Sequence, residues 1–150
     1  MRILLLAFLV PIAFGCSRGP ISVRAAKKHA EVVFRGTIVG FRSSTGDETK
    51  TDLSETRQPG WTAVFLVARV WKGTVGPTFE MPALPEGGAC FGFWPTFLKV
   101  GTDILVYANR IDGAGDYYTD ICNRTQFASM TKDFAQLGPG HKPRQSKHAP

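Results

Sequence analysis

The stretch E-V-V-F-R-G-T-I-V-G-F-R, residues 31–42, decides the fold. Its β-branched and aromatic residues are dense, which favours a strand over a helix. Gly36 and Gly40 interrupt it, and glycine inside a strand indicates a bulge or a sharp bend. The stretch therefore predicts one long, strongly coiled strand that can serve two halves of a curved sheet.

Four further segments downstream have strand patterns. The strongest is W-T-A-V-F-L-V-A-R-V-W, residues 61–71, which is apolar on both faces and is therefore expected to be central. Shorter strands are expected at residues 78–81, 103–109 and 117–122. A turn at Asp112 to Asp116 separates the last two of these strands.

Two helices are expected outside the strands. Val23 to Ala30 predicts a short helix with Ser22 as its N-cap. Near the C-terminus, apolar residues fall on one helical face and Gly138-Pro139 stops the helix, with Asn123 or Thr125 as its cap. The residues on that face are Phe127, Met130, Phe134 and Leu137.

The pattern as a whole predicts a mainly β fold, a five-stranded antiparallel OB-type barrel with a short N-terminal helix and a C-terminal amphipathic helix. A β-sandwich has a similar composition and remains the alternative. One domain is expected over residues 16–138, with a long exposed loop at 43–60 and a basic disordered tail at 139–150.

The first residues have the parts of an export signal. One basic residue precedes an apolar run from Ile3 to Phe14, and Ala13-Phe14-Gly15 fits the rule for cleavage before Cys16, which removes residues 1–15 as a signal peptide. The same residues half-fit a lipobox, in which Cys16 receives a lipid. The apolar run is too short for a membrane span of about 20 residues. The protein is expected to be exported, either secreted or periplasmic, or a membrane-anchored lipoprotein.

The three cysteines of the chain are Cys16, Cys90 and Cys122. Export places them in an oxidising compartment where disulfides form, and an odd number leaves one over. Cys90 pairs naturally with Cys122 if Cys16 carries a lipid. Otherwise Cys16 competes for either partner, and the sequence leaves the pairing open.

Several short segments share one order and spacing with a known family. They are a Cys-x-x start at Cys16 before a short helix, A-E-V-V-F-R-G at 30–36, V-W-K-G at 70–73, C-F-G at 90–92, V-G at 100–101, L-V-Y-A at 105–108 and C-N-R-T at 122–125. Together they resemble the tissue inhibitor of metalloproteinases family and its netrin-type relatives, in particular single-domain bacterial members. The resemblance covers residues 16–138 and implies an OB-type barrel.

The resemblance implies an inhibitor of zinc metalloendopeptidases. The α-amine and carbonyl of mature Cys16 would chelate the protease zinc, Ser17 would enter the specificity pocket, and a Cys16–Cys90 disulfide would hold the end rigid. The chain departs from the animal family at Arg18, where a second cysteine is usual. Cys122 therefore loses its expected partner. Lipidation of Cys16 would block the amine, so the alternative is an anchored envelope lipoprotein with an interaction role and no inhibitory activity.

Other residue patterns favour structural roles. No nucleophile–base pair or metal-ligand spacing stands out, so no catalytic residue, metal or cofactor is expected. The formal net charge of +6 comes from scattered basic residues, and no nucleic-acid partner is expected. A small basic patch of Arg18, Arg24, Lys27 and Lys28 is a solvated face that could meet anionic lipid headgroups. The following aromatic residues are expected in the core rather than in a stacking platform: Trp61, Trp71, Phe91, Phe93, Trp94 and Phe97.

Overall fold

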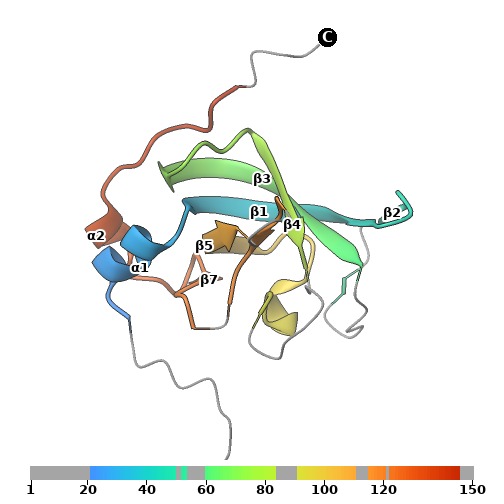
Figure 1. The fold of residues 1–150 in the computed structure, drawn as a ribbon, viewed down its shortest axis with the longest axis horizontal. Helices are drawn as coiled ribbons and strands as arrows, with labels where there is room; N and C mark the ends of the chain where they lie inside the picture. The colour runs from blue at the N-terminus through green and yellow to red at the C-terminus, as the bar shows by residue number, and fades with distance from the viewer. Residues whose placement is uncertain are drawn as a thin grey trace, which may run out of the picture.

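The computed structural model describes residues 21–49, 52–53, 60–83, 91–110, 115–120 and 122–145. These residues form one antiparallel sheet with two short α-helices at one end (Figure 1). The strands are β1 Val32–Ser43, β2 Glu48–Thr49, β3 Trp61–Lys72, β4 Thr78–Pro82, β5 Asp103–Arg110, β6 Tyr117–Tyr118 and β7 Gln126–Phe127. The helices are α1 Val23–His29 and α2 Phe134–Leu137, with a 3-10 turn at Pro95–Phe97.

The strands follow the order β4-β3-β1-β5-β6, and β2 and β7 pair with β1 and β5. The mainly β prediction, the short N-terminal helix and the strands at β1, β3, β4 and β5 are confirmed. The described residues contain seven strands rather than five. The two extra strands are dipeptides in segments expected to be a loop and a helix, where neighbouring backbone supplies pairing that the local sequence does not indicate.

Strand β1 is the coiled strand that the sequence predicts. It pairs with β3 along its length and with β5 through Val32–Thr37. Its register against β3 shifts between Arg35 and Gly36 and again between Ile38 and Gly40, which confirms both glycine irregularities. A Cβ at Gly36 would lie 3.2 Å from the carbonyl oxygen of Leu66, so the bend brings β1 and β3 unusually close.

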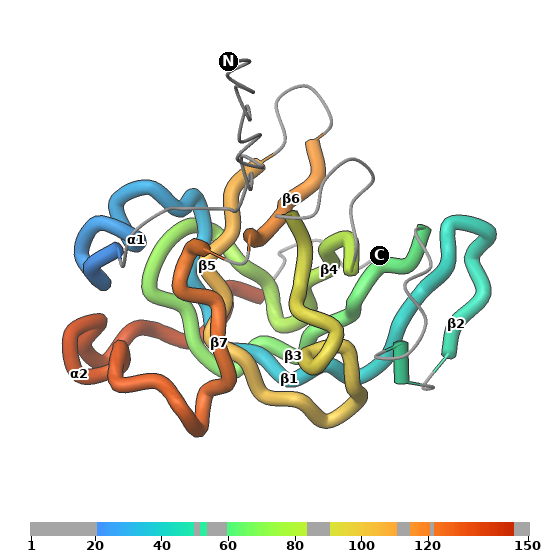
Figure 2. Tube along the Cα trace, turned by 90° about the horizontal axis from the view of Figure 1, so that it is seen from below, coloured from blue at the N-terminus to red at the C-terminus, as the bar shows by residue number. Residues whose placement is uncertain are grey.

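The main core fills the concave side of the sheet. Phe34 lies at its centre, with its ring 5.6 Å from Phe65 and 4.9 Å from Phe79. The edge strands β4 and β6 lie beside each other (Figure 2). The rings of Phe79 on β4 and Tyr117 on β6 are 5.1 Å apart. The sheet therefore curls far enough for side chains from its two edges to touch.

A second apolar cluster lies between the helices and the outer side of the sheet. Helix α1 buries Val23, Ala26 and Ala30 against β1, β5 and α2. Because both faces of β5 are covered, the strand is buried from Ile104 to Ala108. Strand β3 lies between β4 and β1, so the expectation that 61–71 is central is confirmed. Burial alternates along the strand nevertheless, and Leu66 is 54% exposed.

The expected amphipathic helix over Phe127 to Leu137 is wrong in its first half. Phe127 pairs with Ile104 as part of β7, and its ring packs edge-on to Phe97 at 4.5 Å. Met130 is 73% exposed. Helix α2 contains Phe134–Leu137 alone. Apolar spacing did not distinguish a helix from a strand followed by a turn, because the strand's partner lies far away in sequence.

Residues 139–145 differ from the disordered tail that the sequence predicts. His141 exchanges two backbone hydrogen bonds with Val70, at 2.8 and 2.9 Å, and the amide of Arg144 donates to the Val75 carbonyl at 3.0 Å. Gly140, with φ of +61°, sits so close to β3 that a Cβ there would be 2.8 Å from the Val70 oxygen. The end of β3 thus binds this segment through backbone groups. Residues 146–150 lie outside the described residues.

Candidate functional site

Of the residues expected to carry function, the described part of the chain contains Cys122. Cys16, Ser17 and Cys90 lie outside the described residues, as do Arg18 and the whole of the predicted signal peptide. Cys122 is half-buried, and its amide donates to Asp120 Oδ1 at 2.7 Å. The candidate site is therefore built on the base of the segment that carries Cys16 and Ser17. This base is Ile21, the first described residue after that segment, together with the residues that hold it.

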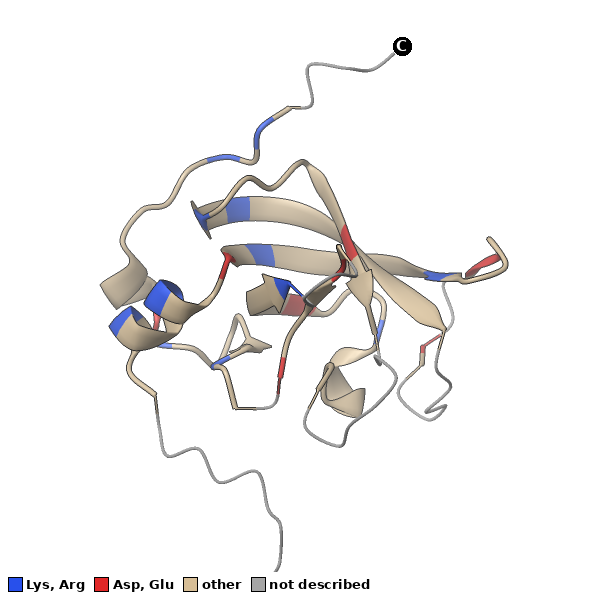
Figure 3. Ribbon diagram, in the orientation of Figure 1, with Lys and Arg blue, Asp and Glu red and all other residues tan. Residues whose placement is uncertain are grey.

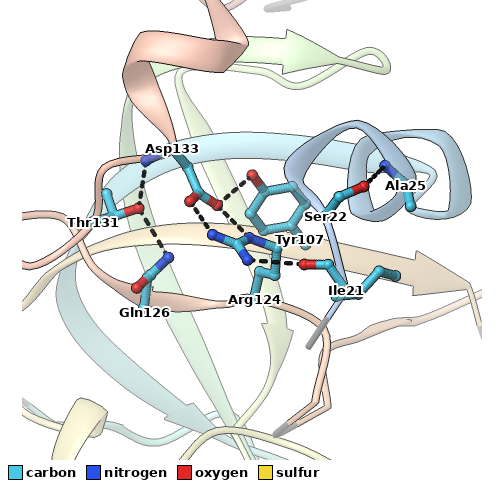
Figure 4. A network of polar contacts seen from close by, with 8 residues as sticks. All are labelled: Ile21, Ser22, Ala25, Tyr107, Arg124, Gln126, Thr131 and Asp133. Atoms are coloured by element: carbon cyan, nitrogen blue, oxygen red, sulfur yellow. Dashed lines mark hydrogen bonds and ion pairs between the residues drawn. The ribbon is translucent and has the colours of Figure 1, made fainter. Parts of the chain in front are cut away.

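Arg124 holds this base in place (Figure 4). Its Nη1 donates to the Ile21 carbonyl at 2.8 Å, and its Nε donates to Asp133 Oδ2 at 2.8 Å. Arg124 also adopts a left-handed backbone with φ of +75°, which costs a non-glycine residue about 1–2 kcal/mol. The turn that holds it is stabilised by Asn123, whose Oδ1 accepts from the Thr125 amide at 3.1 Å.

Asp133 is the centre of the network. It is 1% exposed and accepts hydrogen bonds from the Tyr107 hydroxyl at 2.9 Å and from Arg124, with which it forms an ion pair. Burial acts to raise the pKa of Asp133, but the hydrogen bonds from Arg124 and Tyr107 outweigh it and hold the pKa below its usual value. Burial, followed by the bond to Asp133, raises the pKa of Tyr107. At neutral pH the group is therefore a carboxylate held by two donors.

The end of β3 ties both helices to the sheet. Trp71 stacks on Phe134 of α2 at 5.4 Å and donates from Nε1 to the Gly138 carbonyl at 2.8 Å. The ammonium of Lys72 donates to the carbonyls of Lys27 and Lys28 at 2.9 and 2.8 Å. Those carbonyls are among the ones that a helix leaves unpaired at its C-terminus. Lys72 therefore caps α1 from a neighbouring strand.

Gly73 completes this corner of the fold. Its φ is +79°, and a Cβ would lie 2.7 Å from both the Glu31 oxygen and Val32 Cγ1. A side chain there would displace the start of β1. The tripeptide Trp71-Lys72-Gly73, quoted above for its family resemblance, thus fixes α2, α1 and β1 through three separate contacts.

Lys72→Met is expected to lower the free energy of unfolding by about 1–2 kcal/mol, because it removes two charge-assisted bonds and keeps the apolar stem. Urea denaturation measures the change. Lys99→Met is the matched control, since Lys99 is exposed in the turn before β5. Equal effects of the two substitutions would contradict a capping role for Lys72.

The segments next to Cys90 and Cys122 lie together. Phe91 forms an isolated antiparallel bridge with Asp120, and the Gly92 amide donates to the Thr119 carbonyl at 2.8 Å. The Phe91 ring meets Tyr118 edge-on at 5.2 Å. The residue that follows Cys90 is therefore paired with a residue close before Cys122.

The six aromatic residues do not form one platform. Phe93 and Phe97 are buried in the main core, as expected, while Phe91 and Trp94 are 48% and 50% exposed. Trp71 is used in the contact with α2. Glycine, proline and aromatic residues alternate in the segment 91–97. The sequence pattern there therefore does not distinguish buried aromatic side chains from exposed ones.

The described residues show neither a cluster of metal ligands nor a helix suited to cross a membrane. Within the described ranges, no three His, Cys, Asp or Glu side chains gather where they could share a metal ion. In the same part of the chain, no helix has the length and apolar character that crossing a membrane requires. His29 and His141 are exposed.

A comparison with models of protein families and a comparison with curated proteins both find no match to this chain.

The network around Asp133 is the part of the candidate site that the sequence does not indicate. Arg124 belongs to the quoted C-N-R-T segment, but nothing in its local pattern indicates a bond to Ile21, 103 positions away. Asp133 falls within the residues expected to form the helix. A charged side chain next to the apolar positions of that helix was the one local indication of its buried ion pair.

Proposed function

We propose that this chain is an exported protein-binding domain of the tissue inhibitor of metalloproteinases and netrin type, which blocks a zinc metalloendopeptidase through Cys16 and Ser17. The observation that supports it is the bond from Arg124 to the Ile21 carbonyl, which fixes the chain a few residues after Cys16. Ordering one residue costs about 1–2 kcal/mol. A terminus with a fixed base loses less freedom when it enters a protease cleft.

The chemistry requires an unmodified mature terminus. A neutral α-amine and the carbonyl oxygen of Cys16 would bind the protease zinc in a five-membered ring and displace the water that attacks substrate. An α-amine has a pKa of about 8, so a useful fraction is neutral near pH 7. The small side chain of Ser17 would then face the specificity pocket.

An OB-type barrel is part of the proposal. The sheet order, the three register shifts of β1 against β3 and the contact of Phe79 with Tyr117 across the two edge strands all favour a closed barrel over a sandwich. A sandwich would place its two sheets face to face, whereas here one long strand continues from one half of the sheet into the other.

One extra alanine in front of Cys16 in the mature protein is expected to weaken inhibition at least about a hundredfold, because the peptide bond removes the free amine that would bind zinc. The measurement is the inhibition constant against a panel of zinc metalloendopeptidases. Lys99→Gln is the matched surface control and should inhibit as the wild type does. Equal inhibition by the extended protein would overturn the chelation mechanism and leave the fold assignment untouched.

A second candidate is a lipid-anchored envelope lipoprotein with an interaction role and no inhibitory activity. The bridge between Phe91 and Asp120 supports it, because it brings the residue after Cys90 close to the residues before Cys122, and a disulfide needs Cα atoms within about 4.4–6.8 Å. That pairing leaves Cys16 available for lipid. An acylated α-amine cannot chelate zinc.

Intact mass of the mature protein, measured without reducing agent in soluble and membrane fractions, separates the two candidates. An unmodified mass beginning at Cys16, with Cys16 linked to Cys90 in peptide maps, supports the inhibitor. A membrane-bound species heavier by a diacylglyceryl group and an acyl chain, with Cys90 linked to Cys122, supports the lipoprotein and contradicts chelation.

A further inference from the structure

The outward face of α1 is basic. The helix turns Val23 and Ala26 toward the sheet. Arg24 and Lys28, four positions apart, are exposed on the opposite side, and Lys27 beside them is half-buried. The first turn of the helix contains no acidic residue. Figure 3 shows the Lys and Arg positions gathered on this helix.

The three cations affect the helix differently. Lys27 and Lys28 lie in its last turn, where the helix dipole favours positive charge. Arg24 lies in the first turn, where the dipole opposes positive charge, and it is also repelled by Lys28 four positions on. The stability of α1 also comes from its buried face and from Lys72, whose ammonium binds the carbonyls of Lys27 and Lys28 and adds one more positive charge to this end. Folding therefore accounts for the two lysines but not for Arg24, which extends the positive face to the start of the helix.

Several other basic side chains have carboxylate partners. Arg35 binds Asp103 at 2.6 Å, and Arg42 binds Glu48 and Glu80 at 2.9 and 2.7 Å. These pairs neutralise the sheet locally. No carboxylate forms an ion pair with the cations of α1 among the described residues.

The charges are also distributed unevenly along the molecule. Figure 3 shows acidic positions on β2 and β4 at the end away from the helices, where Glu48 and Glu80 lie. The acidic residues beside the helices, Glu31 and Asp133, form ion pairs with Arg110 and Arg124, which leaves the cations of α1 in excess at that end. A molecule with this asymmetry turns its α1 end toward a negative surface.

We propose that the outward face of α1, formed by Arg24, Lys27 and Lys28, is a docking surface for the anionic headgroups of a lipid bilayer. A short exposed helix presents three cations without a groove or an aromatic side chain among them, which suits a flat charged surface better than a nucleic acid. The helix also begins a few residues after Cys16, the residue at which membrane processing is expected.

This surface goes beyond the proposed function, because it operates whether or not Cys16 carries a lipid. In a lipoprotein that carries a diacylglyceryl group and an acyl chain, the lipid provides the anchor and the basic face adds attraction to anionic headgroups. In an unlipidated inhibitor, the same face would concentrate the protein at the envelope. The test therefore uses mature protein in which Cys16→Ser removes lipidation.

The experiment is co-sedimentation with vesicles of phosphatidylcholine and phosphatidylglycerol in a ratio of about 7:3, whose anionic headgroups attract Lys and Arg. The wild-type surface is expected to bind these vesicles and to release them as salt rises. The triple variant R24Q/K27Q/K28Q is expected to bind at least about tenfold more weakly. The control K99Q/K142Q/R144Q removes the same charge away from α1 and should retain most of the binding.

Three results would overturn the proposal: equal loss in both triple variants, equal binding to pure phosphatidylcholine vesicles, or no vesicle binding by the wild-type surface. Binding to a soluble polyanion without vesicle binding would assign the face to an acidic macromolecule instead. Thermal unfolding of all variants checks the fold, since the substituted side chains point outward. None of these results depends on protease inhibition, so the two proposals fail separately.

Discussion

Asp133→Asn is expected to lower the free energy of unfolding by about 3 kcal/mol. The amide keeps the shape of the side chain but removes the charge that faces Arg124, whose guanidinium is 29% exposed and therefore screened in part by water. The Tyr107 hydroxyl also loses a charged acceptor. Urea denaturation at pH 7 measures the change.

The same substitution is expected to alter the pH dependence of stability. The pKa of Asp133 is lowered in the folded protein, so its contribution is complete above the unfolded pKa of about 4 and is lost as pH falls through the folded pKa. The wild type should therefore lose stability in acid more steeply than Asp133→Asn does. Asp116→Asn, at an exposed carboxylate, is the control and should change neither quantity appreciably. Parallel acid curves would show that the ion pair contributes nothing.

Gly73→Ala is expected to destabilise the fold by about 3 kcal/mol. The left-handed backbone accounts for about 1–2 kcal/mol. The rest is steric, because the new Cβ would lie 2.7 Å from a backbone oxygen and from Val32 Cγ1, and neither can rotate away. The affected contact joins the end of β3 to the start of β1, where the corner with α1 is built.

Gly101→Ala isolates the steric part of this effect. Gly101 has φ of +87°, close to that of Gly73, but nothing lies within 4 Å of its Cβ position. Its substitution is expected to cost about 1 kcal/mol, through backbone conformation alone. The difference between the two variants, read from urea denaturation, is the cost of the close approach. Equal losses would mean that β1 moves aside without resistance.

Sequence reasoning succeeded where local pattern and final environment agree. The glycines of β1 are needed at the bends they indicate, and Ser22 accepts from the Ala25 amide at 3.2 Å, as the N-cap prediction requires. The short helix and the longer strands follow from residues that each interact mainly with close neighbours or with the core. The predicted strands make up most of the sheet.

Prediction failed where distant backbone chose between alternatives. Phe127 has the spacing of a helical residue, yet Ile104 pairs with it as a strand. His141 lies in a basic, proline-bearing segment, yet Val70 offers it two hydrogen bonds. The proposed site has the same difficulty, because Arg124 reaches Ile21 across most of the chain. Such contacts are visible when the sheet is already assembled and have no local signal.

The contacts of α1 also determine when the helix can dock onto the sheet during synthesis. Helix α1 is synthesised before the residues that hold it. Lys72 caps its C-terminus, and Leu137 covers part of its apolar face. Arg124 binds the carbonyl of Ile21, which comes just before the helix. An emerging chain therefore cannot dock its own beginning until its late residues arrive. Until then, the Ile21 carbonyl and the C-terminal carbonyls of α1 lack the side-chain donors that fix them in the finished fold.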